Sequence, residues 1–151
     1  MKKTLLALTV FSVLFFGCKK STNAEEQAAI DDTKIQAYIA ANNLTMTKDV
    51  SGLYYQIITE GSGTAPTTAS HVRVAYTGTL LDGTAVDSST NFSTLLSSTI
   101  QGWQIGLPLI KPGGRILLII PSALGYGTTK TGSIPENSVL VFTIDLFKVQ
   151  G

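Results

Sequence analysis

The alternation of hydrophobic and polar residues predicts a protein built mainly from β-strands. Val72, Val74 and Tyr76 alternate with more polar neighbours, which is typical of a strand with one buried face. Asp82-Gly83 predicts a tight turn after this strand. Runs of apolar, β-branched and aromatic residues predict three further strands, over residues 53–58, 115–120 and 139–149.

Two segments predict helices. Residues 31–45 carry acidic side chains near their start and Ile35, Tyr38 and Ile39 at helical spacing, so we expect one amphipathic helix there. Residues 100–109 are interrupted by glycine and proline, which favours a helix of only a turn or two. Strands dominate, so the predicted class is α+β with an antiparallel sheet.

The predicted central strands are apolar on both faces. Leu117, Ile119 and Val141 point away from the face that is expected to form the main core, which would contain Ile116, Leu118, Ile120, Leu140, Phe142 and Ile144. An antiparallel sheet that is covered on one side normally has polar residues on the other. We therefore expect the helix around residues 35–39, or a partner subunit in a homodimer, to cover the second face.

The N-terminal residues resemble an export signal. Lys2 and Lys3 precede a short apolar run over residues 5–16, which is too short to span a bilayer comfortably. Cys18, the only cysteine, follows this run and resembles the lipidated cysteine of bacterial lipoproteins. An ordinary secretory signal with an incidental thiol is the alternative. If Cys18 is modified, the mature chain has no disulfide and its fold rests on core packing.

Composition and charge exclude several classes of function. The 151 residues are 44% hydrophobic, enough for one domain with a real core. Loss of Lys2 and Lys3 with the signal would reduce eleven basic residues to nine, against ten acidic ones, so nothing favours nucleic-acid binding. His71 is the only histidine and has no cysteine near it, which argues against a zinc site; we expect no metal and no cofactor.

Short motifs follow one another in a fixed order between residues 74 and 142. They read Val74-Ala75-Tyr76-Thr77-Gly78, Asp82-Gly83, Asp87-Ser88-Ser89, Thr99-Ile100-Gln101-Gly102-Trp103, Gly125-Tyr126-Gly127, Ile134-Pro135-Glu136-Asn137 and Leu140-Val141-Phe142. In this order and spacing they resemble the FKBP-type peptidyl-prolyl cis-trans isomerases. The resemblance implies a twisted antiparallel sheet wrapped around one short helix. It also implies an enzyme that acts on proline-containing polypeptides.

The resemblance implies an aromatic pocket. Trp103 would form its floor, Tyr76 and Phe142 its walls, and Asp87 would pair with Tyr76 at the rim. From the residues alone other readings stay open. Trp103 and Phe142 are the kind of residue that fills any core, Tyr76 can be a core residue with a satisfied hydroxyl, and Asp87 can simply close a turn.

Three more residues have roles implied by the resemblance. The backbone amide of Ile100 would hold one substrate carbonyl, the hydroxyl of Tyr126 would bind another, and Ile134 would come from a loop that overhangs the pocket. A helix start has free amides by geometry, which makes an acceptor site at Ile100 physically reasonable. A large aromatic residue between two glycines, like Tyr126, favours exposure for contact over packing.

One side of the expected pocket departs from the family pattern. Val86 stands where the family usually has phenylalanine, and residues 90–98 form a shortened segment in which Phe92 and Leu95 compete for the aromatic position. Ser98 and Thr99, at the expected edge of the pocket, are more polar than the residues that the family usually has there. We expect catalysis at a reduced level, with Val86, Phe92, Thr99 and Ile134 contacting substrate.

The sequence therefore divides into a lipoprotein signal peptide (1–17), a tether (18–30), an N-terminal helix (31–45) and an isomerase domain (50–151). We expect a lipid-anchored protein of the bacterial cell envelope, facing the periplasm or the cell surface, that assists the folding of exported proteins. The alternative is an FKBP-like chaperone or peptide-binding module with little catalysis.

Overall fold

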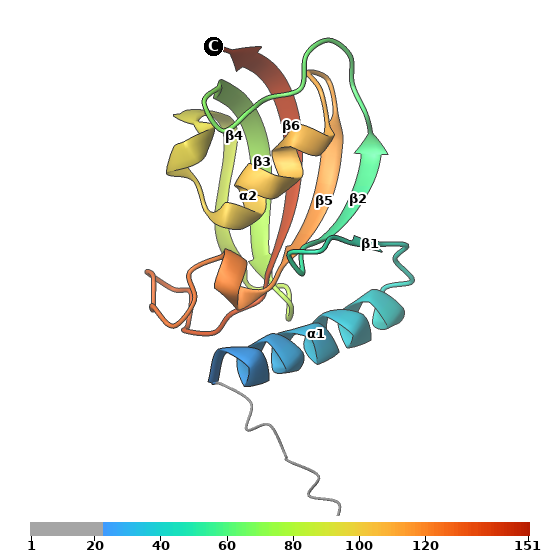
Figure 1. Cartoon of the computed structure of the whole chain (residues 1–151), viewed down its shortest axis with the longest axis vertical. Coiled ribbons are helices and arrows are strands. Elements are labelled where there is room, and N and C mark those ends of the chain that lie inside the picture. Colours follow the sequence, from blue (N-terminus) through green and yellow to red (C-terminus); the bar gives the residue numbers. More distant parts are fainter. Residues whose placement is uncertain (1–22) are drawn as a thin grey trace, which may run out of the picture.

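The computed structural model describes residues 23–151, so the predictions about the signal peptide and Cys18 lie outside the described residues. A six-stranded antiparallel sheet, in the order β1-β2-β5-β6-β3-β4, curves around the short helix α2 (Gln101–Gly106; Figure 1). The predicted α+β class with an antiparallel sheet and one short internal helix is confirmed. The strands are β1 (Thr47–Lys48), β2 (Tyr54–Thr59), β3 (His71–Leu80), β4 (Ala85–Leu95), β5 (Arg115–Ile120) and β6 (Leu140–Gln150).

One long helix precedes the first strand, and the shorter helices lie in the connections between β4 and β5 and between β5 and β6. The α-helices are α1 (Asn23–Ala41) and α2 (Gln101–Gly106), and the short 3-10 helices are η1 (Leu96–Ser98), η2 (Leu107–Leu109) and η3 (Ser122–Leu124). Within residues 23–151, none of the helices is both long and apolar enough to cross a membrane.

The main core lies between α2 and the inner face of the sheet. Two glycines let α2 approach β5 closely, because a Cβ at Gly102 would lie 2.6 Å from the Ile120 side chain, and one at Gly106 would lie 2.7 Å from Leu118. Real side chains do not tolerate such distances, so this close approach requires glycine. It fixes Trp103, on the same turn, against the sheet.

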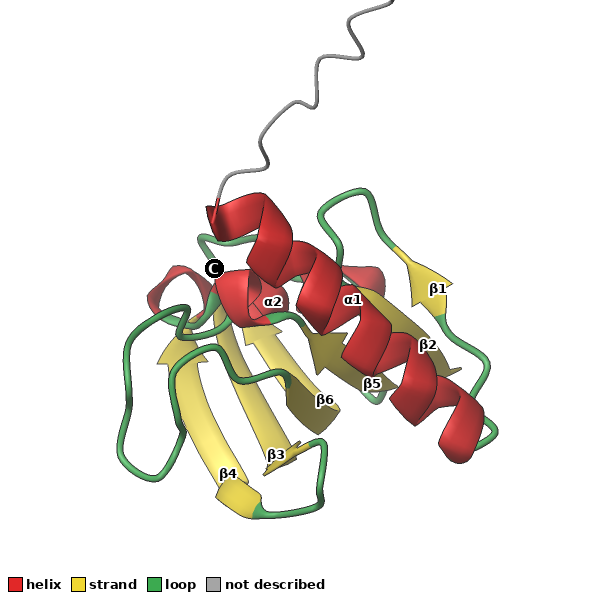
Figure 2. Ribbon diagram, turned by 90° about the horizontal axis from the view of Figure 1, so that it is seen from below, coloured by secondary structure: helices red, strands yellow, loops and turns green. Residues whose placement is uncertain are grey.

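Helix α1 covers the second apolar face. Ile35 is fully buried in a separate cluster with Tyr54, Ile119 and Val141. Seen from below, α1 lies across the end of the sheet that faces the viewer (Figure 2). The prediction that this helix covers the second face is confirmed, and a homodimer stays a prediction.

The bounds of α1 differ from those predicted. The helix begins at Asn23 and ends at Ala41. The predicted helix 31–45 is therefore right over residues 31–41 and too long at its end, and the predicted tether 18–30 is wrong from residue 23 onward. Residues 23–29 are rich in alanine, glutamate and glutamine, which are strong helix formers. At the other end Asn43 adopts a φ of 51°, and Leu44 donates its amide to the Ile39 carbonyl, which ends the helix in a Schellman motif.

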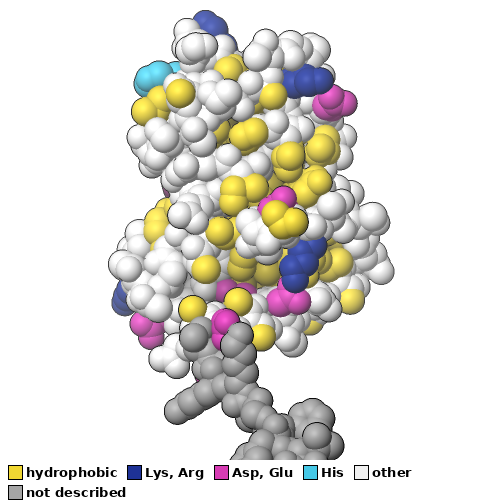
Figure 3. Space-filling model, in the orientation of Figure 1, with side chains coloured by type: hydrophobic (Ala, Val, Ile, Leu, Met, Phe, Trp, Pro, Cys, Tyr) yellow, Lys and Arg dark blue, Asp and Glu magenta, His cyan; other side chains and the backbone are white. Residues whose placement is uncertain are grey.

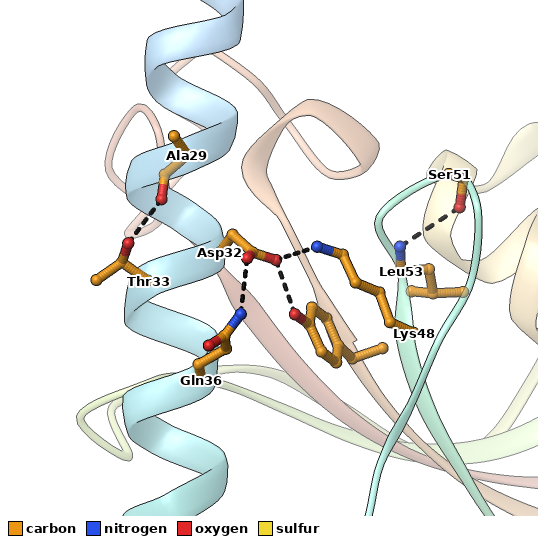
Figure 4. Close-up of polar contacts among 8 residues, drawn as sticks. Ala29, Asp32, Thr33, Gln36, Lys48, Ser51 and Leu53 are labelled. Atoms are coloured by element: carbon orange, nitrogen blue, oxygen red, sulfur yellow. Dashed lines mark hydrogen bonds and ion pairs between the residues drawn. The ribbon is translucent and has the colours of Figure 1, made fainter.

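A surface cluster also ties α1 to the sheet. The Asp32 carboxylate accepts hydrogen bonds from Lys48 of β1 and, at 2.7 Å, from the Tyr54 hydroxyl of β2 (Figure 4). The hydrogen bond from Lys48, followed by that from Tyr54, lowers the pKa of Asp32 below its ordinary value. The charged form of Asp32 therefore favours the docked helix.

Candidate active site

An aromatic cluster stands at one end of the main core. The Trp103 ring of α2 meets the rings of Tyr76 and Phe142 edge-on, with centroids 4.9 and 5.4 Å apart. Phe142 of β6 pairs with Gly78 of β3, where a Cβ would lie 2.4 Å from the Phe142 ring. Glycine at this position therefore lets the ring lie over β3, beside Tyr76.

Strand β4 completes the cluster through a register shift. Val74 pairs with Phe92 and Gly78 pairs with Asp87, and a bulge lies between these two pairs. Positions 74, 76 and 78 share one face of β3. The shift therefore places Phe92 and Asp87 diagonally on either side of Tyr76. The Phe92 ring contacts Tyr76 edge-on at 5.7 Å.

These side chains surround a cavity of about 340 Å³. Every residue that was predicted to take part in catalysis lines it, and so do Phe92 and Thr99. Its lining is largely aromatic with a few polar groups, as is usual for sites that bind small or extended ligands. The lining residues are Tyr76, Asp87, Phe92, Thr94, Ser98, Thr99, Ile100, Trp103, Tyr126 and Phe142.

Some assignments for the pocket walls need correction. Val86 is half-buried against the main core, and Ile134 is 6% exposed within it; neither lines the cavity. Of the two residues that competed for the aromatic position, Phe92 lines the cavity and Leu95 does not. Thr94 lines it although sequence reasoning missed it. Its position two residues after Phe92 would have placed it on the same face, had residues 85–95 been recognised as a strand.

The Tyr76 hydroxyl donates a hydrogen bond of 2.6 Å to the Asp87 carboxylate. The other Asp87 oxygen accepts from the Ser88 amide at 2.8 Å. Burial, followed by the hydrogen bond and the negative charge of Asp87, raises the pKa of Tyr76 to about 12. Tyr76 therefore stays protonated at any physiological pH, with its proton directed to Asp87.

Tyr126 lies on a tightly held loop. Its side chain is 37% exposed, and its hydroxyl makes no hydrogen bond within the part of the chain that the structure describes. The amides on either side, from Gly125 and Gly127, both donate to the carbonyl of Ser122, at 3.0 and 2.8 Å. Gly127 has a φ of 58°, which suits glycine. The hydroxyl is thus free to meet a ligand, while its backbone is fixed.

The start of α2 offers a second donor. Ile100 is the N-cap residue of α2, and its carbonyl accepts from the amide of Trp103 at 3.0 Å. Among residues 23–151, no acceptor is found for the amide of Ile100 itself. The Thr99 hydroxyl, by contrast, already has a hydrogen-bond partner, because it donates to the Leu96 carbonyl at 2.7 Å.

The Trp103 side chain is held by packing alone. It is 4% exposed, and its indole Nε1 is buried without a hydrogen-bond partner in the described part of the chain. Buried tryptophan N–H groups usually have a hydrogen-bond partner, but this one has none. The ring is instead held by its edge-on contacts with Tyr76 and Phe142. The same residues 23–151 contain no group of three or more His, Cys, Asp or Glu side chains that could hold a metal ion.

Hydrophobic side chains are scattered over the face that carries α2 (Figure 3). Charged side chains of both signs lie among them, mainly in the lower half of the view and at its edges. The arrangement is a largely aromatic slot beside the Tyr126 hydroxyl and the Ile100 amide, neither of which has a hydrogen-bond partner among residues 23–151. It also contains a tyrosine–aspartate pair in which Tyr76 is buried and Asp87 is exposed. Such a site can strip water from an apolar group and hold neighbouring carbonyls, without forming a covalent bond.

This fold and pocket define an FKBP-type domain. Residues 62–147 match the family model described as FKBP-type peptidyl-prolyl cis-trans isomerase, and the chain belongs to this family. Two curated relatives are named FKBP-type peptidyl-prolyl cis-trans isomerase FkpA. The relative from Aeromonas hydrophila is 38% identical over 84% of this chain and 50% of its own length. The relative from Escherichia coli K12 is 39% identical over 83% of this chain and 49% of its own length.

Solved structures agree with this assignment. The crystal structure of FkpA from Escherichia coli has a TM-score of 0.73 and 38% identity, covering 83% of this chain and 62% of that one. The crystal structure of a peptidyl-prolyl cis-trans isomerase from Pseudomonas syringae also has a TM-score of 0.73, with 29% identity. The match covers 87% of this chain and 98% of that one. The chain spans about half the length of the curated relatives that it matches.

Proposed function

We propose that this chain is a peptidyl-prolyl cis-trans isomerase that acts on proline-containing polypeptides. The observation that carries the proposal is the aromatic cavity at Tyr76, Trp103 and Phe142, which has a free hydroxyl at Tyr126 and a free amide at Ile100 beside it. Membership of the family supports the same activity.

The proposed mechanism is non-covalent. Rotation about an X-Pro bond is opposed by amide resonance, with a barrier of about 18–20 kcal/mol. The aromatic floor and walls would remove water from the prolyl ring, which favours the twisted amide with its less polar carbonyl. The Ile100 amide and the Tyr126 hydroxyl would each hold a carbonyl, and Asp87 would orient Tyr76.

The pocket walls bear on selectivity. Val86 packs into the core, and Phe92 supplies the aromatic surface on the β4 side. Phe92 is 37% exposed, so this wall is open to solvent. We propose that the open wall accepts many residues before proline and lowers the catalytic rate.

We also propose that the protein acts on exported proteins from a lipid anchor at Cys18. This proposal rests only on the sequence, where Lys2, Lys3 and the apolar run over residues 5–16 precede the single cysteine. Residues 50–151 would then form the isomerase domain, held near the membrane by the segment before it.

An isomerase assay on a short proline peptide, read through a protease that cleaves only the trans form, tests the activity. We expect wild type to accelerate isomerisation. Loss of one hydrogen bond in Tyr126→Phe should lower kcat/KM about 2- to 10-fold. Trp103→Leu should lower it further because the floor is lost, and Asp87→Ala should also lower it.

The alternative of a chaperone with little catalysis gives a different result in the same assay. A wild-type protein no faster than buffer, which still suppresses aggregation of an unfolded client, would reject the enzyme and support the binding module. Equal rates for wild type and Trp103→Leu would reject the assigned pocket.

A further inference from the structure

A buried carboxylate joins α1 to the loop that carries Tyr126. Asp31 is 1% exposed, and its Oδ2 accepts from both the amide and the hydroxyl of Ser122, at 2.8 and 2.6 Å. Its Oδ1 accepts from the Gln27 side chain at 2.8 Å. A buried charge is costly unless it is hydrogen-bonded, and here both carboxylate oxygens are occupied.

The hydrogen bonds continue from Ser122 to the pocket. The Ser122 carbonyl accepts from the amides of Gly125 and Gly127, which flank Tyr126. The Gly127 carbonyl in turn accepts from the amide of Asn137, at 2.7 Å. An unbroken path therefore runs from Asp31 to both the Tyr126 loop and the segment that ends at Asn137.

The docking of α1 has other contacts besides this carboxylate. Ile35 is already fully buried on the sheet, and Asp32 already bonds to Lys48 and Tyr54 (Figure 4). Two apolar groups in place of Asp31 and Ser122 would pack the same elements without burying a charge. The Asp31–Ser122 contact has a different consequence, which is that it fixes the backbone on which Tyr126 is mounted.

We propose that Asp31 is a positioning residue that holds Tyr126 in place through Ser122. Helix α1 thereby contributes to the geometry of the active site. This inference rests on the proposed isomerase activity. Asp31 touches no pocket residue, and it acts by limiting where the Tyr126 hydroxyl lies. Small displacements of a group that binds substrate can cost up to about 100-fold in rate.

Asp32 supplies a matched control, because it is the adjacent carboxylate on the same helix and bonds to β1 and β2 instead. We expect Asp31→Ala to lower kcat/KM by up to about tenfold, and by no more than Tyr126→Phe does, because it acts through the same hydroxyl. Asp32→Ala should leave kcat/KM close to that of wild type. Asp31→Asn keeps one oxygen for Ser122 and should recover most of the activity. Equal losses in Asp31→Ala and Asp32→Ala would overturn the proposal.

A double-mutant test distinguishes positioning from general loss of structure. If Asp31 acts through the Tyr126 hydroxyl, Asp31→Ala should cost little in a Tyr126→Phe background. The same fractional loss in both backgrounds would overturn the proposal. Ser122→Ala removes only the hydroxyl contact and keeps the amide bond to Asp31, so it serves in the same cycle if Asp31→Ala fails to fold.

Hydrogen exchange tests the positioning without any assay of activity. In Asp31→Ala and Ser122→Ala, the amides of Gly125, Gly127 and Asn137 should exchange faster than in Asp32→Ala, whereas Asp31→Asn should stay close to Asp32→Ala. Faster exchange in a protein without isomerase activity would reject the proposed function and keep the positioning role. Unchanged exchange would reject the positioning role whatever the activity.

Discussion

At the scale of residues, the chemistry of the pocket depends on the proton of Tyr76. This proton lies in a hydrogen bond of 2.6 Å from the buried Tyr76 to the exposed Asp87 carboxylate. Loss of the proton would place a negative charge on a buried side chain next to a second negative charge, which is why the pKa of Tyr76 rises to about 12. Folding therefore stabilises the protonated tyrosine.

The raised pKa of Tyr76 predicts a loss of stability in alkali. Because the pKa is higher in the folded protein than its ordinary value of 10.0, the stabilisation is full below pH 10.0 and disappears as pH rises to about 12. We expect it to amount to about 2–3 kcal/mol. Urea unfolding at several pH values should show wild type losing stability through this window more steeply than Tyr76→Phe. Parallel curves would contradict the assignment.

Gly78 is predicted to be essential for the shape of the pocket. In Gly78→Ala the new Cβ would lie 2.4 Å from the Phe142 ring, so the ring must move away from β3. Such overpacking should lower the free energy of unfolding by about 1–3 kcal/mol and reduce kcat/KM as well. Thr77→Ala, at an exposed position on the same strand, is the control and should change neither. The isomerase assay and urea unfolding together decide the outcome.

Most of the pocket residues that were predicted come from the motifs, whereas outside them Phe92 was one of two candidates and Thr94 was missed. Tyr76, Trp103 and Phe142 come from segments whose order matches the family, and they meet as expected. The different roles of Asp31 and Asp32 could not be predicted. Both precede the same apolar positions in the sequence, but the partner of Asp31 lies 91 residues away, on a loop whose position only the fold decides.

At the scale of elements, the hydrophobic pattern predicted the strands that have buried faces and missed the segments whose side chains are mostly exposed. The strands β2, β3, β5 and β6 each have apolar runs or alternation and were predicted. The edge strand β4 is mainly serine, threonine and asparagine, and its exposed side chains leave no apolar pattern to read. The start of α1 was missed because a solvent-exposed turn rich in alanine and glutamate has the composition of a tether as well as that of a helix.

The role of α1 as a cover for the sheet can be measured with two isoleucines on the same helix. Ile35 is fully buried against the second face of the sheet, whereas Ile30 is 47% exposed. Ile35→Ala should lower the free energy of unfolding by about 2–4 kcal/mol, because it removes apolar contacts and leaves a cavity. Ile30→Ala should change it by less than about 0.5 kcal/mol. Similar values for the two variants in urea unfolding would show that α1 does not stabilise the domain.

At the scale of the whole molecule, α1 joins two surfaces that are far apart in the sequence. One side of the helix covers the back of the sheet through Ile35, and Asp31 reaches the loop beside the pocket. A helix that precedes the family domain is thereby connected to the site inside it.

The anchor itself leads to the last prediction. If Cys18 carries lipid, Cys18→Ser should move the protein from the membrane fraction to the soluble fraction of the cell envelope, and metabolic labelling with a fatty acid should disappear. Two or more acyl chains give stable anchoring, whereas two lysines next to them add only about 1 kcal/mol each. Replacement of Lys19 and Lys20 by glutamine is therefore a control that should leave the protein in the membrane fraction. An ordinary secretory signal predicts the opposite, with wild type and Cys18→Ser both soluble and both unlabelled.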